Sequence, residues 1–500
     1  MEEQTRATST ARSHLEKGQR ALAAQNLAEA QAQLELAVEA DPKLDEAHFA
    51  LGILELQRGE ATAAIPHFRK VIELAPKSFQ GHYHLALAYL RDQKLQEGAE
   101  ELERAVAINP RHADAAYNLG VVLTELDRPK EALTYLRRAS NLGPKRADVT
   151  FHLIQAELAS GHSEEARREA EEGVKLFGAD AAWQKTVGEA LLHYGQPIEA
   201  ISHLSEVLRL EPGPDIRRQL AAAHLEARDP GRVLALLQNA TSAEDHYLLA
   251  SAYLQMHRMT EADQESQLAL TLEPQNPRYL LQRARMDQHL GKHLESLAVL
   301  EEVSQLNPKW PEPHYSAGVS YYLLHRYADA RQSLDRALEL DPSSVRALFL
   351  YSASLANEGR NREAEKVLSR AIARQPGNPR FQYHLGAIRL RDNREAEAQQ
   401  AFEQAIRLKP DYAPPHYQLG KLFERAGQLK RATEELEIAV RYQPDLAQAF
   451  YHLGRIYNRL GEKEKSEKAL STFRQFKQAP TTEDREFIEG IQQELQRSER

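Results

Sequence analysis

Prolines recur at a fixed spacing of 34 residues along most of this 500-residue chain. The spacing is seen in two runs, Pro76, Pro110 and Pro144, and then Pro274, Pro308, Pro342, Pro376, Pro410 and Pro444. A constant period of this length is the signature of one supersecondary unit that is repeated many times. The prolines therefore predict a stack of about fourteen repeats over residues 11–480 rather than a single compact core.

Apolar and small residues fall at helical spacing within each repeat when the recurrent proline is taken as position 32. In the repeat 113–146, for example, they are Leu119, Gly120, Leu123, Ala132 and Leu136. The terminal proline ends the second helix because it lacks a backbone donor and clashes with the preceding turn. Each repeat is therefore predicted to be a hairpin of two helices, and the fold class to be all-α.

The pattern resembles the tetratricopeptide repeat (TPR) consensus. The matching features are Leu-Gly at positions 7 and 8, an aromatic residue at 11, Ala at 20 and 27, and Pro at 32. The resemblance implies an α-solenoid, a right-handed superhelix of TPR hairpins. A single 34-residue hairpin buries too little surface to offset its conformational entropy, so the stability of such an array comes from stacked neighbours.

The repeat boundaries divide the chain into five predicted segments. Residues 1–10 carry no pattern and are expected to be a disordered tail. Six repeats at 11–214 precede a shortened, irregular repeat of 28 residues at 215–242, and seven more repeats follow at 243–480. Residues 481–500 are predicted to form a capping helix, because Thr482 is a suitable N-cap and Phe487, Ile491 and Leu495 share one face.

The TPR resemblance implies that positions 2, 5, 9, 12 and 13 of the first helices line a concave groove. In the early repeats this stripe is apolar and aromatic, and we expect it to take apolar anchors of a partner protein. Packing that is typical of TPR repeats is the alternative role for the aromatic residues at position 5. The candidate residues are Phe49, Ile53, Leu56, Tyr83, Leu87, Leu90, Tyr117, Val121 and Phe151.

In the last three repeats the same stripe is basic. Clustered Arg and Lys side chains attract carboxylates, which favours an acidic segment of a partner. The alternative is a solvated face whose cations pair with neighbours such as Glu424, and the sequence leaves open whether the two stripes bind one ligand or two. The candidate residues are Arg380, Tyr383, Arg391, Tyr417, Lys421, Arg425, Tyr451, Arg455 and Arg459.

Motifs for catalysis, cofactors or metal are not found in the sequence. The chain has no cysteine, and its twenty histidines mostly follow the repeat register instead of forming ligand sets. A net charge of −9 argues against nucleic acid as a partner. No apolar stretch is long enough to span a membrane, so we expect a cytoplasmic protein, or a periplasmic one if a signal peptide has been removed.

Three functions are compatible with these features. The first is a non-catalytic scaffold or adaptor that binds a protein or peptide in the groove. The second is a structural subunit of a bacterial secretion, pilus or polysaccharide-export assembly. The third is a detached regulatory subunit of an enzyme that is encoded separately. Because the TPR resemblance speaks for the fold far more than for function, the sequence favours the first without identifying the partner.

Overall fold

The computed structural model describes residues 2–476, which form 28 helices and no strand. They divide into two compact blocks at Asp229, and we describe each block by itself. The N-terminal block contains α1 (Glu2–Ala23), α2 (Leu27–Ala40), α3 (Asp45–Arg58), α4 (Ala61–Leu74), α5 (Phe79–Arg91), α6 (Leu95–Ile108), α7 (Ala113–Glu125), α8 (Pro129–Leu142), α9 (Ala147–Ala159), α10 (Ser163–Phe177), α11 (Ala181–His193), α12 (Pro197–Leu210) and α13 (Pro214–Glu226).

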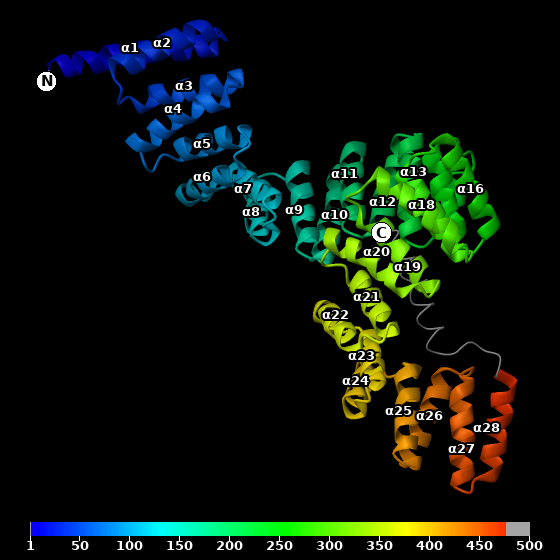
Figure 1. Ribbon diagram of the computed structural model, residues 1–500. Coiled ribbons are helices and arrows are strands. Elements are labelled where there is room, and N and C mark those ends of the chain that lie inside the picture. Colours follow the sequence, from blue (N-terminus) through cyan, green and yellow to red (C-terminus); the bar gives the residue numbers. More distant parts are fainter. Residues whose placement is uncertain (1, 477–500) are drawn as a thin grey trace. The chain divides into compact units, whose positions relative to one another are not determined.

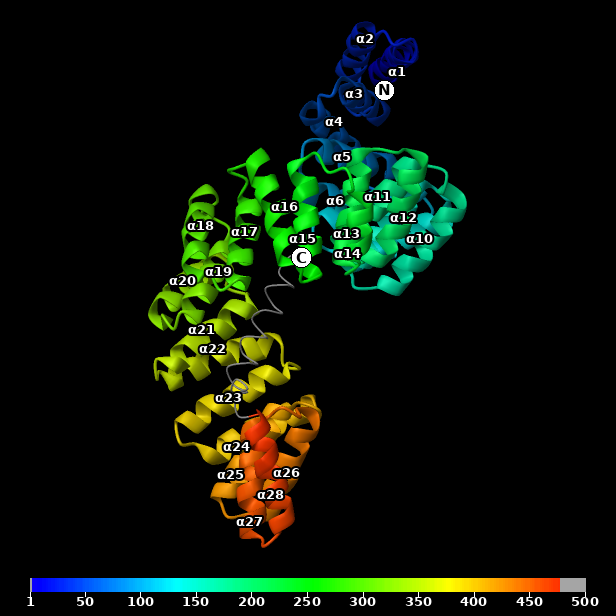
Figure 2. The ribbon, with the colours of Figure 1, turned by 90° about the vertical axis from the view of Figure 1, so that its right-hand side faces the viewer.

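The C-terminal block begins at Pro230. It contains α14 (Pro230–Leu236), α15 (Ala243–Gln255), α16 (Met259–Leu272), α17 (Pro277–His289), α18 (His293–Leu306), α19 (Pro311–Leu323), α20 (Tyr327–Leu340), α21 (Val345–Asn357), α22 (Asn361–Arg374), α23 (Pro379–Arg391), α24 (Glu395–Leu408), α25 (Ala413–Arg425), α26 (Leu429–Tyr442), α27 (Ala447–Arg459) and α28 (Lys463–Phe476). In both blocks each helix packs against the next one along the chain, as the colour gradient in Figures 1 and 2 shows. The predicted all-α helical-repeat solenoid is confirmed.

Helix ends lie where the repeat register places them. The second helix α4 ends at Leu74, two residues before Pro76, and α6 ends at Ile108, two residues before Pro110. Position 15, between the two helices of a hairpin, has a positive φ in every full-length repeat. It is Gly59 (82°) in one repeat and Gln93 (59°) in the next, so the left-handed turn is retained where glycine is absent.

A close approach at position 8 joins the two helices in the hairpins that have glycine there. A Cβ built on Gly120 of α7 would lie 2.5 Å from Cγ of Leu136, which is position 24 of the same repeat. Gly386 meets Phe402 in the same way, at 2.5 Å. The repeat 147–180 uses the reverse arrangement, because Ile154 stands at position 8 and Ala170 at position 24, both buried in one core cluster. In this repeat the small residue stands at position 24, so a large and a small residue still meet where the helices cross.

Histidines at position 4 link the two helices of a hairpin to the preceding repeat. The His82 ring lies between Glu101, whose Oε2 is 2.5 Å from Nδ1, and the Pro76 carbonyl, which is 3.1 Å from Nε2. His416 is held in the same way by Glu435, at 2.6 Å, and by the carbonyl of Pro410, at 3.0 Å. These contacts give the position 4 histidines a structural role. Their place in the repeat register had already favoured such a role over metal binding.

The N-terminal end of the array differs from the sequence prediction. Helix α1 begins at Glu2, so residues 2–10 are helical where a disordered tail was expected. The Thr8 hydroxyl donates to Asp41 at 3.2 Å, and Ala11 is fully buried, which ties this extension to the first hairpin. The predicted capping helix at 481–500 lies outside the described residues.

At 215–242, the shortened repeat has a second helix, α14, of only seven residues.

The glycine contact generates a stability prediction. Gly120→Ile should lower the free energy of unfolding by about 1–3 kcal/mol, because the new side chain overlaps Leu136. Adding Leu136→Ala should restore part of the loss, since the pair then reproduces Ile154 and Ala170. Urea denaturation followed by circular dichroism measures both effects. Equal stability of the wild type and Gly120→Ile would contradict the packing account.

Candidate functional site

The predicted apolar stripe in the N-terminal block is only partly exposed. Leu56 is 7% exposed and belongs to the hydrophobic core, so its assignment to the binding surface is wrong. Leu90 packs against Gly98 of the same hairpin. In these two repeats, position 12 therefore contributes mainly to the interior of the hairpin. Ile53, Leu87 and Val121, at position 9, are half-buried and remain on the surface.

The aromatic residues at position 5 make contacts to the next repeat. The amide nitrogen of Asn118 donates to the Tyr83 hydroxyl at 3.1 Å, and the Tyr117 hydroxyl lies 3.2 Å from Nδ1 of His152. In both pairs the partner is position 6 of the following repeat. Phe49 packs edge-on against His84 of the next repeat, with ring centres 5.0 Å apart, whereas Phe151 packs against His152 of its own helix. The contacts of Phe49, Tyr83 and Tyr117 support the packing alternative for these position 5 aromatics.

The tyrosines of the predicted basic stripe separate into buried and exposed residues. Tyr383 is 3% and Tyr417 is 8% exposed, so neither is the open surface residue that the sequence predicted. Tyr383 packs against Phe402 and Tyr412. Tyr451 is the exception, because it is 41% exposed and packs against Phe473. Arg380 lies over the ring of Phe349, with its guanidinium carbon 5.6 Å from the ring centre.

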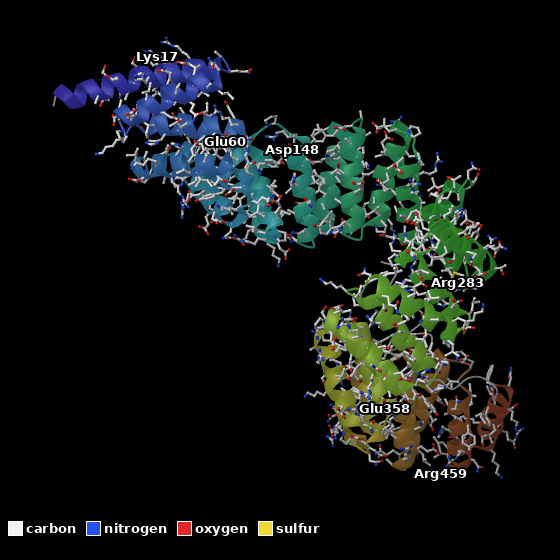
Figure 3. All side chains as sticks on the ribbon, turned by 45° about the horizontal axis from the view of Figure 1, so that its top comes forward. Lys17, Glu60, Asp148, Arg283, Glu358 and Arg459 are labelled. Carbon is white, nitrogen blue, oxygen red and sulfur yellow. The ribbon has the colours of Figure 1, made fainter. Side chains whose placement is uncertain are left out.

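Four of the predicted cations gather at one hollow of about 360 Å³, which we call the basic hollow. It is lined by Lys421 and Arg425 of α25, by Arg455 and Arg459 of α27, and by Glu424, Gly427 and His452. Figure 3 shows Arg459, which ends α27. With four cations and one carboxylate, the lining carries an excess of positive charge.

Neighbouring carboxylates neutralise the basic hollow only in part. The buried carboxylate of Glu424 lies 2.5 Å from Nδ1 of His452 and 3.7 Å from Nη2 of Arg455. Arg425 pairs with Glu395 at 3.6 Å while its side chain stays 58% exposed. Arg455 therefore pairs with Glu424 within the protein, which is the alternative that the sequence left open. Exposed pairs of this kind contribute little, so these cations can also bind other carboxylates.

A second hollow lies on α19, α21 and α23, and we call it the α21 pocket. Its volume is about 380 Å³, and its lining includes Tyr322, Phe349, Ala353, Tyr383, Ala387 and Ile388. Asn357, His384 and Arg391 supply polar groups. The lining comes largely from positions 5, 9, 12 and 13, so the predicted stripe does form one continuous surface here. Tyr383 and Arg391 were assigned to that surface from the sequence, whereas Phe349, Ala353 and Ala387 were missed.

The α21 pocket exists because two neighbouring repeats have alanine at position 9. These residues are Ala353 and Ala387, where the earlier repeats have Ile53, Leu87 and Val121. Ala356 adds a third small residue at position 12. Loss of side-chain volume on a rigid helical scaffold leaves a space that the backbone does not close. This pair of alanines is the sequence signal that could have located the pocket.

His384 gives the α21 pocket an uncharged base. Burial, together with the charges of Arg380 and Arg391, lowers the pKa of His384 to about 3. The imidazole therefore stays neutral at physiological pH. Its ring packs edge-on against Phe349, with ring centres 4.6 Å apart, and against Tyr383 at 5.4 Å.

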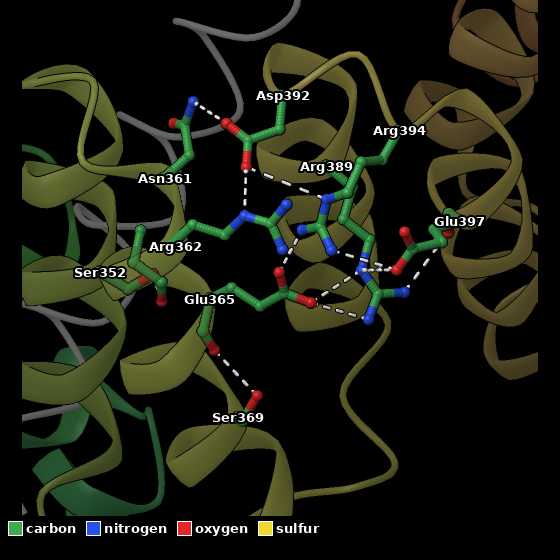
Figure 4. Close-up of polar contacts among 10 residues, drawn as sticks. Ser352, Asn361, Arg362, Glu365, Ser369, Arg389, Asp392, Arg394 and Glu397 are labelled. Atoms are coloured by element: carbon green, nitrogen blue, oxygen red, sulfur yellow. Dashed lines mark hydrogen bonds and ion pairs between the residues drawn. The ribbon is translucent and has the colours of Figure 1, made fainter.

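An ion-pair network behind the pocket fixes α23 to the preceding hairpin (Figure 4). Glu365 of α22 accepts hydrogen bonds from Arg389 of α23, at 2.9 Å, and from Arg394. Burial raises the pKa of Glu365, but the hydrogen bonds from Arg394 and Arg389 outweigh burial and hold the pKa below its ordinary value. Arg394 also reaches Glu397 at 3.1 Å. The network therefore positions the helix that carries Tyr383, Ala387 and Arg391.

Features of other site classes are not present in the part of the chain that the structure describes. No group of three or more His, Asp or Glu side chains within residues 2–476 could hold a metal ion. None of the described helices is long and apolar enough to span a membrane.

Comparison with protein families identifies the repeats. One model, described as a tetratricopeptide repeat, matches residues 15–79, 83–147, 281–345 and 417–480, which is more than half of the chain. The chain belongs to the tetratricopeptide repeat family. Two further TPR models match residues 321–388, and residues 246–276 and 379–412. TPR proteins generally serve as protein–protein interaction scaffolds that bind proteins or peptides, and this is the general role that family membership suggests.

Solved structures similar to this TPR chain were found at low sequence identity, whereas no curated protein sequence matches it. The Cut9–Hcn1 hetero-tetramer of APC/C is 15% identical, with 91% of this chain and 98% of that chain covered and a TM-score of 0.44. MamA is 22% identical over 35% and 94% of the two chains, with a TM-score of 0.33. YrrB, described as a TPR protein with an unusual peptide-binding site, is 21% identical over 38% and 96%, with a TM-score of 0.34. Similarity at this level says nothing about the partner of the TPR protein described here.

The Glu365 network predicts a pH dependence of stability. A carboxyl group whose pKa is lowered by folding stabilises the protein above its ordinary pKa, and this contribution disappears as the pH falls through the lowered value. Glu365→Gln should therefore lower the thermal midpoint at pH 7, and the difference from wild type should shrink below about pH 4. Thermal melts at several pH values measure it. A difference that is constant with pH would contradict the account, and Glu302→Gln, at an exposed carboxyl group on α18, serves as the matched control.

Proposed function

We propose that this TPR protein is a non-catalytic adaptor that binds an acidic segment of a partner protein on the first helices of its C-terminal block. The observation that carries the proposal is the basic hollow, where Lys421, Arg425, Arg455 and Arg459 surround a single buried carboxylate. The cations come from the same face of two successive repeats. An extended or helical segment that crosses these repeats would meet them in sequence.

The chemistry of the basic hollow selects carboxylates. Three of the four cations are arginines, whose planar guanidinium groups can bind a carboxylate through two parallel hydrogen bonds. Clustered positive charge also speeds the approach of an acidic segment, and it does so most at low ionic strength. The single internal carboxylate, Glu424, is engaged by His452 at the base of the hollow. An incoming acidic segment would therefore meet the outer cations first.

In the N-terminal block, we propose that the half-buried side chains at position 9 provide apolar contacts for a partner. Ile53, Leu87 and Val121 repeat on successive first helices and are half-buried, and Ile53 also packs against a core cluster. Leu87→Glu with Val121→Glu should lower binding there without changing the fold, because both side chains are partly exposed. Whether the same partner meets both blocks is decided by comparing this variant with one in the basic hollow.

Charge reversal tests the acidic-segment proposal. Arg425→Glu with Arg459→Glu should weaken binding of a fluorescein-labelled hexaglutamate peptide about tenfold, because each reversal removes an attraction and adds a repulsion of about 0.2–1 kcal/mol. The salt dependence of binding should flatten as well. Fluorescence anisotropy at two salt concentrations measures both quantities.

The control makes the same change in net charge with residues of the N-terminal block that do not line the hollow. Lys17 and Lys175 are exposed in the N-terminal block, and Figure 3 shows Lys17 on α1. Lys17→Glu with Lys175→Glu should leave peptide binding close to that of the wild type. Equal weakening by the two double variants would mean that net charge, and not the basic hollow, attracts the peptide.

A further inference from the structure

The α21 pocket has the size and lining of a site for one bulky side chain. Its volume of about 380 Å³ lies near the lower end of the range of about 300–1,000 Å³ that is typical of ligand sites. The rings of Tyr322, Phe349 and Tyr383 contribute to its walls. Aromatic walls favour an aromatic occupant, because ring edges and faces attract one another in offset or edge-on arrangements.

Polar groups line one side of the pocket in a continuous chain. The Asn357 amide donates to the Tyr322 hydroxyl at 2.7 Å, and Arg391 donates to the Asn357 oxygen at 3.4 Å. The side chain of Arg391 is exposed, and no carboxylate among residues 2–476 pairs with it. Arg391 can therefore bind an external carboxylate without breaking an ion pair within the protein.

We propose that the α21 pocket binds an aromatic side chain of the partner protein while the acidic side chain of the following residue contacts Arg391. This inference rests on the proposed function, since it supplies the specificity of the same acidic segment. Arg391 ends α23, the first helix of the repeat directly before the one that carries Lys421 and Arg425. The pocket would anchor the segment, and the basic hollow would hold its acidic continuation.

The repeat pattern provides a substitution that fills the pocket without introducing a foreign residue. Ala387→Leu places at position 9 the residue that Leu87 already provides in the repeat 79–112. The fold should therefore be retained, which thermal melts check. Gln155→Leu makes the same kind of change at position 9 of a repeat that does not line the pocket, and it is the matched control.

The experiment uses the full chain and N-acetyl-Phe-Glu-amide as the probe, with dissociation constants from saturation-transfer difference NMR. The wild type should bind this probe more tightly than N-acetyl-Phe-Gln-amide. Ala387→Leu should weaken binding about tenfold, because the ring loses its buried site. Gln155→Leu should not change it. Arg391→Gln should make the Glu and Gln probes equal, which tests the carboxylate contact independently of the pocket volume.

Several outcomes would overturn the proposal. One is binding to Ala387→Leu with wild-type affinity, and another is a Glu preference that survives Arg391→Gln. Binding of N-acetylphenylalanine but not of the dipeptide would assign the pocket to a chain terminus. Arg425→Glu with Arg459→Glu should leave the dipeptide affinity unchanged, because the basic hollow does not contact this short probe. Failure at the basic hollow is therefore distinguishable from failure at the α21 pocket.

Discussion

The close approach of the two helices in each hairpin is the constraint on which the rest of the structure depends. Gly at position 8 receives Leu or Phe from position 24, as Gly120 receives Leu136, and a Cβ at position 8 would overlap that side chain. Because the two backbones come close, the residues at positions 4, 11 and 23 reach the neighbouring helix or repeat. The core is accordingly a row of clusters that adjacent repeats share, as expected for an array stabilised by its neighbours.

This constraint leaves the outward stripe of the first helices free to vary. Position 9 is aliphatic in the repeats from 45 to 146, alanine at 353 and 387, and basic at 421 and 455. The same helical scaffold therefore presents an apolar surface, a pocket and a basic hollow in turn. The pocket and the basic hollow lie on neighbouring repeats, so a single segment with an aromatic anchor and acidic residues would match both. A rigid scaffold favours such binding because little ordering is needed on the protein side.

The fold was almost fully predictable from the sequence, since the proline period and the position 8 pattern set each hairpin independently of distant residues. The site was predictable only in part. The register located the outward stripe, but burial depends on what neighbouring repeats place against a residue, which is why Leu56 and Tyr417 are buried where surface residues were predicted. The α21 pocket was not predicted because it is formed by missing side-chain volume at Ala353 and Ala387, whereas sequence patterns indicate binding residues that are present. Helix α1 extends over residues 2–10 through contacts such as Thr8 with Asp41, which have no repeat signature.

Site-specific photo-cross-linking tests the central claim, that the first-helix face of the C-terminal block binds an acidic segment. A photoreactive benzophenone amino acid replaces Asn458, exposed at position 12 of α27, or Lys468, exposed on the second helix α28 of the same repeat. After irradiation in cells, mass spectrometry identifies the cross-linked peptide. The account predicts one acidic segment of a partner, cross-linked from Asn458 and not from Lys468. Equal cross-linking from both positions, or a segment at Asn458 without acidic residues, would contradict it.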